Sequence, residues 1–181
     1  MILTVPFVSQ LSIGKTKAGG DTHDYPTGCW YASACMVGYY FEAGPRFGLP
    51  ELYKLSNAGG KVGQMGHFAT GSDAANRLFP EHHRILAKRE HLEPVDKCET
   101  SHEYTNLELT NLLKTRGPIF MYWMKKHGVQ TYGHASVIIG VEGVEIIYHD
   151  PENSPNSRMT IRKFNSVRQK WEFALMQRIK Q

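Results

Sequence analysis

The stretch from Gly28 to Phe41 constrains the fold more than any other part of this chain. Its apolar residues recur at helical spacing, and apolar or small residues fill most of the positions between them; the spaced set is Trp30, Ala34, Val37 and Phe41. A helix that is apolar around most of its circumference has to be buried. The pair Gly44-Pro45 then ends the pattern. We therefore expect a fold that is built around a buried helix over residues 28–41.

A cysteine stands at the first turn of this predicted helix, in the run Gly28-Cys29-Trp30. The positive end of the helix dipole favours the thiolate, which is the reactive form of cysteine. Cys35 lies about 240° further around the helix, so the two thiols do not share a face and we expect no redox pair. Because a free cysteine is most often a small buried hydrophobe, Cys29 alone does not identify a nucleophile.

Three other polar residues can complete an acyl-transfer site around Cys29. His134 begins an otherwise apolar strand, and Asp150 ends the strand that follows it. Adjacent antiparallel strands joined by a short turn bring their outer ends together, so Asp150 can orient His134 toward Cys29. Gln10 offers a side-chain amide that would stabilise an oxyanion together with a backbone N–H.

Alternative interpretations of these polar residues stay open. Asp150-Pro151 can be a plain turn, and glutamines such as Gln10 are common at surfaces. His149 is the second candidate for a catalytic histidine, although in a strand its side chain points away from that of Asp150. A zinc site is a weaker alternative, because the spacing of the residues concerned matches no standard finger; they are His82, His83, His91, Cys98 and His102. We expect no metal and no cofactor.

The predicted elements change from helices to strands along the chain. An extended segment over residues 3–11 comes first, short helices are expected over residues 50–55 and 72–79, and residues 81–103 are charged and histidine-rich. A capping box, Thr105-Asn106-Leu107-Glu108, begins a helix that runs to Lys114. Strands are predicted over residues 119–124, 134–141, 144–149, 159–164 and 171–177.

The turn at Glu142-Gly143 is short enough to join two neighbouring strands as a hairpin. Helices followed by an antiparallel sheet indicate an α+β fold. A chain of 181 residues suits one domain. We predict a helical lobe over about 1–116 and a sheet lobe over about 117–181.

Composition narrows the classes of partner. Net charge is +4, and no aromatic-interleaved basic patch or nucleic-acid motif accompanies it, so we expect no nucleic-acid partner. No apolar run approaches the ~20 residues that span a bilayer, so we expect no membrane partner. The amino terminus lacks the basic region of a signal peptide. Three cysteines, an odd number, argue against a disulfide framework.

Taken together, Gln10, Gly28-Cys29-Trp30, Gly133-His134 and Asp150 resemble the papain-like cysteine peptidases. The compact length and the start Val5-Pro6-Phe7 more closely resemble the AvrRpt-type bacterial effector proteases and related secreted papain-like toxins. The resemblance covers nearly the whole chain in order and spacing. It implies a two-lobed papain-like fold in which the nucleophile is Cys29, the general base and acid is His134, the orienting carboxylate is Asp150 and the oxyanion donor is Gln10.

Two departures from papain itself accompany the resemblance. Asp150 stands where papain has an asparagine, a variation that its bacterial relatives share. The loop between Gln10 and Cys29 is also longer than in papain.

The same resemblance implies a cysteine endopeptidase, a bacterial effector or toxin that cleaves specific proteins in a target cell. Such a protein would have a protein substrate and would be secreted or delivered by a specialised secretion system. It would act in a reducing cytoplasm and could have a cognate immunity or inhibitor protein. The alternatives are an acyl-transferase or glutamine deamidase on the same fold, and a non-catalytic protein-binding module. The presence of Cys29, His134 and Asp150 together argues against the binding module.

Overall fold

The sheet is the part of the molecule that positions everything else. The computed structural model describes residues 1–10, 29–42, 83–84, 86–88 and 90–179. Within these residues the strands form one six-stranded sheet in the order β1-β6-β2-β3-β4-β5, and every neighbouring pair is antiparallel. The strands are β1 (Leu92–Pro94), β2 (Ile119–His127), β3 (Gln130–Glu142), β4 (Glu145–His149), β5 (Ser157–Thr160) and β6 (Leu175–Arg178).

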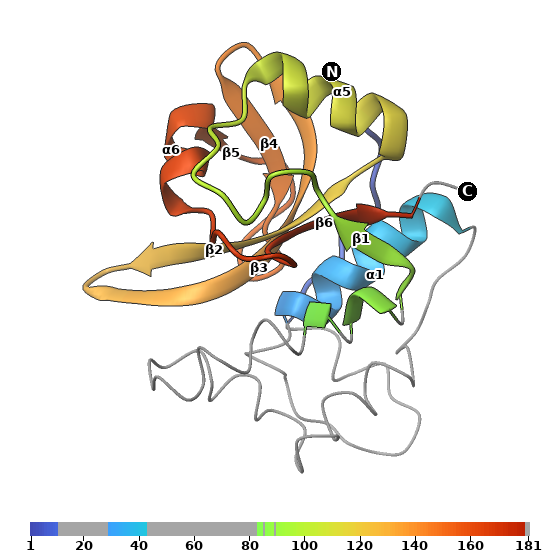
Figure 1. Ribbon diagram of the computed structural model, residues 1–181. Helices are drawn as coiled ribbons and strands as arrows, with labels where there is room; N and C mark the ends of the chain where they lie inside the picture. The colour runs from blue at the N-terminus through green and yellow to red at the C-terminus, as the bar shows by residue number, and fades with distance from the viewer. Residues whose placement is uncertain (11–28, 43–82, 85, 89, 180–181) are drawn as a thin grey trace, which may run out of the picture.

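Three helices cover this sheet from two sides (Figure 1). They are α1 (Cys29–Phe41), α5 (Asn106–Arg116) and α6 (Ile161–Val167). Figure 1 shows α1 against one face, with α5 and α6 on the other side. The predicted α+β class is confirmed.

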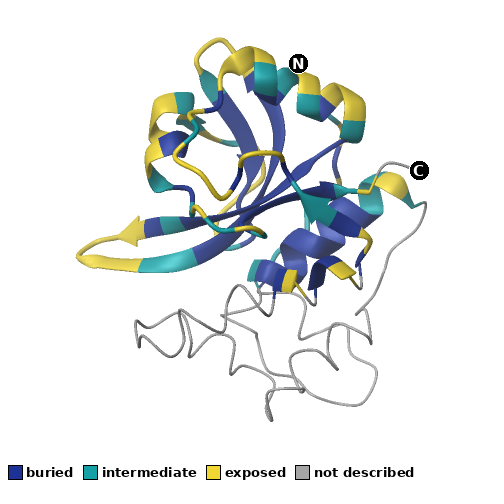
Figure 2. Cartoon of the chain, in the orientation of Figure 1, coloured by how far each residue is buried: buried dark blue, intermediate teal, exposed yellow. Residues whose placement is uncertain are grey.

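The two faces of the sheet carry two separate apolar cores, because successive residues of a strand point to opposite sides. Phe120, Tyr122 and Val137 pack with α1 in one core. Met121 and Ile138 pack with apolar residues of α5 and α6 in the other. The central strands are therefore buried on both faces, as Figure 2 shows. Alternation assigns the residues of β2 to the two cores, and in β3 it reverses at the register shift, where Ile139 packs in the first core and Val141 in the second.

Helix α1 matches the prediction for residues 28–41 within one residue. Every residue from Trp30 to Gly38 is buried, as expected of a helix that is apolar around most of its girth. Among the described residues, no helix combines the length and the apolar character that crossing a membrane requires.

Helix α5 begins at the capping box that the sequence predicts. The Thr105 hydroxyl accepts from the Glu108 N–H at 3.2 Å, and the Glu108 carboxylate accepts from the Thr105 N–H at 2.8 Å. The helix extends two residues beyond the predicted Lys114 and ends before Gly117, whose φ is 79°. The predicted turn between β3 and β4 is also confirmed, with Gly143 at a φ of 57°.

The carboxyl-terminal strand predictions are wrong in part. Residues 161–164 form the start of α6 and not a strand, because the Thr160 side chain caps the helix by accepting from the Lys163 N–H at 3.1 Å. Residues 171–174 form a turn, in which the Ala174 N–H donates to the Trp171 carbonyl at 2.9 Å. Only the end of the predicted strand over residues 171–177 pairs in the sheet, as β6.

The charged segment over residues 81–103 contains a strand that the sequence pattern did not predict. Strand β1 pairs with β6 at one edge of the sheet, with Leu92 opposite Arg178. The helices predicted over residues 50–55 and 72–79 lie outside the described residues. So does most of the segment over residues 1–91, and the division into lobes at about residue 116 stays a prediction. Strand β1 nevertheless joins the sheet from the helical side of that boundary.

The first ten residues form an extended segment along β3 and β4, as predicted. The Leu3 N–H donates to the Ile139 carbonyl at 2.8 Å, and the Gln10 N–H donates to the Pro151 carbonyl at 2.9 Å. Ile2 makes an isolated bridge with Gly140, next to a register shift in the β3–β4 pairing. Gln10 is thereby fixed beside the loop that follows β4.

The buried guanidinium of Arg168 holds the loop that follows β1. It donates to the carbonyl oxygens of Cys98 at 2.8 Å and Thr100 at 2.9 Å, and it lies 5.0 Å from the ring centre of Tyr104. Burial lowers the pKa of Arg168. The positive charge therefore stays buried only because these carbonyl dipoles surround it.

Replacing Arg168 with methionine is expected to destabilise the fold by about 3 kcal/mol, since it leaves the carbonyl of the buried Cys98 and two partly buried carbonyls without this donor. Urea denaturation followed by fluorescence measures the loss. Arg158, an exposed arginine paired with Glu142 and Glu145, provides the matched control, and Arg158→Met should leave the free energy of unfolding nearly unchanged. Equal effects of the two substitutions would contradict this account of Arg168.

Candidate active site

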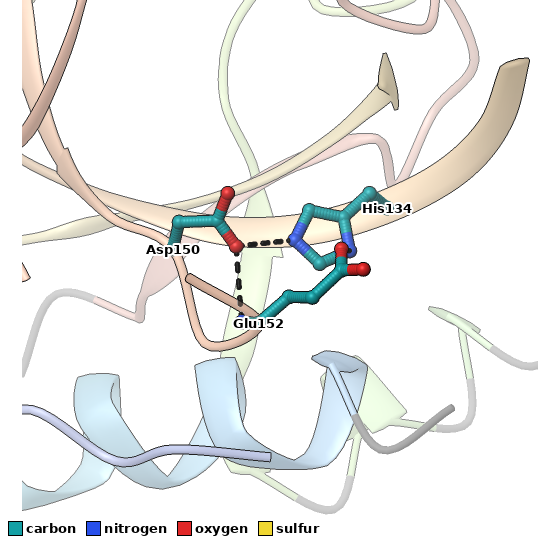
Figure 3. Close-up of side chains that lie close together, drawn as sticks. All are labelled: His134, Asp150 and Glu152. Atoms are coloured by element: carbon teal, nitrogen blue, oxygen red, sulfur yellow. Dashed lines mark hydrogen bonds and ion pairs between the residues drawn. The ribbon is translucent and has the colours of Figure 1, made fainter. Parts of the chain in front are cut away.

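His134 and Asp150 are in direct contact. His134 lies within β3, which begins at Gln130 and not at His134 as predicted. Asp150 follows β4 in a turn in which the Asn153 N–H donates to the Asp150 carbonyl at 3.1 Å. Its carboxylate oxygen Oδ1 lies 2.7 Å from Nε2 of His134 (Figure 3). The same oxygen accepts from the Glu152 N–H at 3.0 Å. The sequence prediction that these two residues meet rested on hairpin geometry, and the structure shows the contact.

The first residue of α1 lies against the same part of β3. The backbone N–H of Ala135 donates to Sγ of Cys29 at 3.4 Å. The thiol lies near enough to His134 for its charge to raise the pKa of the imidazole. Nε2 of His134 is engaged by Asp150, which leaves Nδ1 for the thiol. The structure thus brings Cys29, His134 and Asp150 together from α1, β3 and the loop after β4.

Gly133 lets an aromatic side chain approach this strand closely. A Cβ at this position would lie 1.9 Å from the hydroxyl oxygen of Tyr122. No other residue could therefore occupy position 133 without displacing Tyr122 from its place between the sheet and α1. The glycine of the Gly133-His134 pair is thus explained by packing beside the site.

Burial and charge act in opposite directions on His134. Burial disfavours the imidazolium, but the charge of the nearby Cys29, together with the hydrogen bond and charge of Asp150, outweighs it and raises the pKa of His134 to about 9. For Asp150, burial is likewise outweighed, and the hydrogen bonds and charges of His134 and Lys125 lower its pKa to about 2. At neutral pH Asp150 is an anion, and the Nε2–H of His134 is the donor in their hydrogen bond.

A lysine and a second carboxylate surround this pair, and the sequence analysis did not single them out. The ammonium of Lys125 donates to Oδ2 of Asp150 at 2.7 Å and to Oε2 of Glu152 at 2.9 Å. The hydroxyl of Tyr132 donates to the same Glu152 carboxylate, 2.7 Å from Oε2. That oxygen also lies 3.8 Å from Nδ1 of His134. Figure 3 shows the Glu152 carboxylate reaching back beside the imidazole.

Aromatic rings enclose the imidazole on the β2 side. The ring of Trp123 lies 5.8 Å from that of His134, with 69° between their planes, and its N–H donates to the Ser136 hydroxyl at 3.1 Å. The ring of Tyr132 lies 6.1 Å away at 79°. These edge contacts restrict rotation of the imidazole and exclude water from its hydrogen bond with Asp150.

Gln10 is buried, and its backbone is tied to the carbonyl of Pro151, next to Asp150. The segment over residues 1–10 thus brings this glutamine to the loop that carries the carboxylate. Its role as oxyanion donor stays a prediction.

His149 is held away from this cluster. The Asn156 N–H donates to its Nδ1 at 3.2 Å, so Nε2 carries the proton and donates to the Val5 carbonyl at 2.9 Å. Burial lowers the pKa of His149, which keeps the ring neutral. Both ring nitrogens are used by backbone groups, so this histidine ties the amino-terminal segment to β4.

Metal ligation competes poorly with these contacts. In the described part of the chain, His134, Asp150 and Glu152 offer donor atoms within 4.8 Å of one another. The ammonium of Lys125 already lies between the two carboxylates. Three of the residues considered for zinc have other partners: the thiol of Cys98 donates to the Glu172 carbonyl at 2.9 Å, His102 pairs with Glu108 at 2.9 Å, and Nδ1 of His83 lies 3.1 Å from the Phe173 carbonyl. His82 lies outside the described residues.

A thiol next to a protonated imidazole, which a buried carboxylate orients, can perform nucleophilic acyl transfer. Comparison with known protein families agrees with this chemistry. One family, described as papain-like cysteine protease AvrRpt2, matches residues 15–169 of the chain. The matched range includes Cys29, His134 and Asp150, whereas Gln10 precedes it.

Proposed function

Because the chain belongs to the family of papain-like cysteine proteases represented by AvrRpt2, and is therefore a hydrolase of peptide bonds in proteins, we propose that it is an endopeptidase with Cys29, His134 and Asp150 as its catalytic triad. The proposal rests above all on one observation. The imidazole of His134 binds Asp150 through Nε2 at 2.7 Å, and the backbone N–H of the next residue, Ala135, donates to Sγ of Cys29 at 3.4 Å.

In this mechanism Sγ of Cys29 attacks the carbonyl carbon of the scissile peptide, and a C–S bond forms. The oxyanion that develops would be stabilised by the Gln10 amide and a backbone N–H at the start of α1. The Nδ1–H of His134 protonates the leaving amine, the C–N bond breaks, and an acyl-enzyme remains. His134 then takes a proton from water, the hydroxide attacks the acyl carbon, and the C–S bond breaks to release the acid and the thiolate.

Asp150 holds the imidazole in place through both steps. Because its pKa is lowered to about 2, it stays ionised and stabilises the imidazolium without taking its proton. The pKa of His134, about 9, means that the imidazolium is present at neutral pH before substrate binds. The general acid is thus charged in the resting enzyme.

We further propose that the enzyme acts as a bacterial effector or toxin, delivered into a target cell where it cleaves specific proteins. The compact length and the start Val5-Pro6-Phe7, followed by Gly28-Cys29-Trp30-Tyr31-Ala32, resemble effector proteases and support this role. All three cysteines are free, which suits a reducing cytoplasm. A cognate immunity or inhibitor protein would protect the producing cell.

Alkylation of the three free thiols tests the nucleophile directly. Iodoacetamide at pH 7 is expected to label Cys29 at least about 100-fold faster than the two buried thiols, because reactivity follows exposure and thiolate character. Cys29 is partly exposed, Cys35 and Cys98 are buried, and burial raises the pKa of Cys98. Peptide mass spectrometry over a time course gives the three rates. Equal rates in the folded protein would contradict the proposal.

Mapping of new amino termini in a protein mixture separates peptidase activity from the alternatives. An endopeptidase generates new amino termini, whereas a glutamine deamidase adds about 1 Da to intact peptides. An acyl-transferase releases the first leaving group and joins the acyl group to a second amine, which yields a new amide. The same acyl-enzyme chemistry would serve all three reactions.

A further inference from the structure

The lysine beside the proposed triad, Lys125, is buried, which is rare for a charged ammonium. Lys125 lies on β2, and only 8% of its side chain is exposed. Strand register places it opposite Tyr132, two positions along from Trp123, which lies opposite His134. All four side chains consequently share one face of the β2–β3 pair. A buried ammonium has to be compensated by charge, and here two carboxylates compensate it.

The lysine completes the set of hydrogen bonds on Asp150. Oδ2 accepts from Lys125 at 2.7 Å, while Oδ1 accepts from His134 at 2.7 Å and from the Glu152 N–H at 3.0 Å. Rotation of the carboxylate about its Cβ–Cγ bond would break all three contacts at once. The plane of Asp150, and with it the direction of the imidazole, is therefore fixed from β2 as well as from the loop after β4.

The lysine also sets the charge around His134. The groups that face the imidazole are Cys29 from α1, Asp150 and Glu152 from the loop after β4, and Tyr132 from β3. Three of these are anions when the thiol is ionised, and Lys125 is the cation that touches both carboxylates. Tyr132 and Lys125 hold the Glu152 carboxylate 3.8 Å from Nδ1 of His134, beyond hydrogen-bond distance.

We propose that Lys125 is a positioning residue that fixes Asp150 for catalysis, and that Lys125 and Glu152 together set the pH range in which His134 is charged. The inference rests on the proposed triad. Without the lysine, the site becomes more negative and the imidazolium is stabilised to higher pH. Without the Glu152 charge, the imidazolium is lost at lower pH. The two substitutions thus have opposite signs, which a general disturbance of packing would not produce.

The charge on His134 can be read without a peptide substrate. Iodoacetate is an anion and is attracted by the imidazolium, whereas iodoacetamide is neutral. The ratio of their rate constants at Cys29, measured by mass spectrometry between pH 6 and 11, falls as His134 loses its proton. For the unsubstituted protein the fall is expected near pH 9, the pKa of His134.

Lys125→Met is expected to move this midpoint up by about one pH unit, and Glu152→Gln to move it down by a similar amount, as Coulomb energies over a few ångströms in a partly buried site imply. Lys125→Arg keeps the charge and should leave the midpoint in place. The methionine variant should also lose about tenfold in kcat on fluorescein-labelled casein with little change in KM, because Asp150 is less well held.

Midpoints that do not move, or that move in the same direction in both variants, would overturn the inference. If Lys125→Met fails to fold, as judged by circular dichroism, Glu152→Gln decides alone, since a downward shift supports the inference and an unchanged midpoint refutes it. The proposed function fails separately. Casein cleavage that survives Cys29→Ala would refute the triad. If Cys29→Ala abolishes cleavage but the Lys125 and Glu152 variants leave the midpoint unmoved, only the role of Lys125 is refuted.

Discussion

Cys29→Ala is expected to abolish cleavage of protein substrates while leaving the fold intact. Without the sulfur no acyl-enzyme can form, so kcat/KM should fall by about 10⁴-fold or more. Cys29 is the first residue of α1 and is only partly buried, so little packing is lost with the thiol. The initial rate of fluorescein-labelled casein hydrolysis measures activity, and thermal unfolding followed by circular dichroism measures stability.

Cys35→Ala is the matched control for this experiment. It removes the same atom from the same helix, but from a buried site in the core against β3. We expect a loss of stability of about 1 kcal/mol and a change in kcat/KM of less than threefold. If Cys29→Ala kept a tenth of the activity, or if Cys35→Ala were the more damaging variant, Cys29 would not be the nucleophile.

His134→Ala is the second substitution with a large expected effect. It removes both the general acid for the leaving amine and the partner of the thiol, and we expect kcat/KM to fall by about 10³-fold to 10⁴-fold. It also leaves Asp150 with Lys125 as its remaining side-chain partner, because His134 is the side chain that binds Oδ1. The selective alkylation of Cys29 over Cys35 should weaken in the same variant.

His149→Ala tests whether the loss of any buried histidine lowers activity, or only the loss of the proposed catalytic one. His149 lies one residue before Asp150 and is similarly buried, but it binds the Val5 carbonyl and the Asn156 N–H. Its removal should cost about 2 kcal/mol of stability and less than tenfold in kcat/KM. If His149→Ala lost more cleavage activity than His134→Ala, the catalytic histidine would be His149 and not His134.

The meeting of His134 and Asp150 could be predicted from sequence because a hairpin fixes it. The turn at Glu142-Gly143 pairs Val137 with His149, so the chain before Val137 lies beside the chain after His149. The prediction held although β3 begins at Gln130 and not at His134. The helix that begins at Cys29 could also be predicted from sequence, since the spacing of its apolar residues fits a helix alone. Local rules decide both features, so no knowledge of distant contacts was needed.

Lys125 could have been found by the same kind of reasoning. It follows Trp123 by two positions on a strand, so alternation places it on the face that carries His134. The sequence analysis ended the strand at residue 124, one position too early for that inference. Glu152 and Tyr132 could not be assigned without coordinates, because their contact depends on the path of the turn after Asp150.

The two errors in the carboxyl-terminal third have different causes. Residues 159–164 have an alternating start that suits a strand, and the local cap of the Thr160 hydroxyl on the Lys163 N–H decides for a helix. Residues 171–174 are mostly apolar but turn, because the chain passes from Arg168, whose backbone bridges to Trp123, to the sheet position of β6. Only the second outcome is set by tertiary contacts that no local pattern contains.

The extended segment over residues 1–10 couples the candidate active site to the amino-terminal part of the chain. Its backbone is bonded to β3 at Leu3, to His149 at Val5 and to the Asp150 loop at Gln10. A proteolytic cut between Val5 and Gln10 would separate the part that is bonded to β3 and His149 from the part that is bonded to the Asp150 loop. Cleavage in this segment could therefore disturb the proposed triad without reaching its thiol.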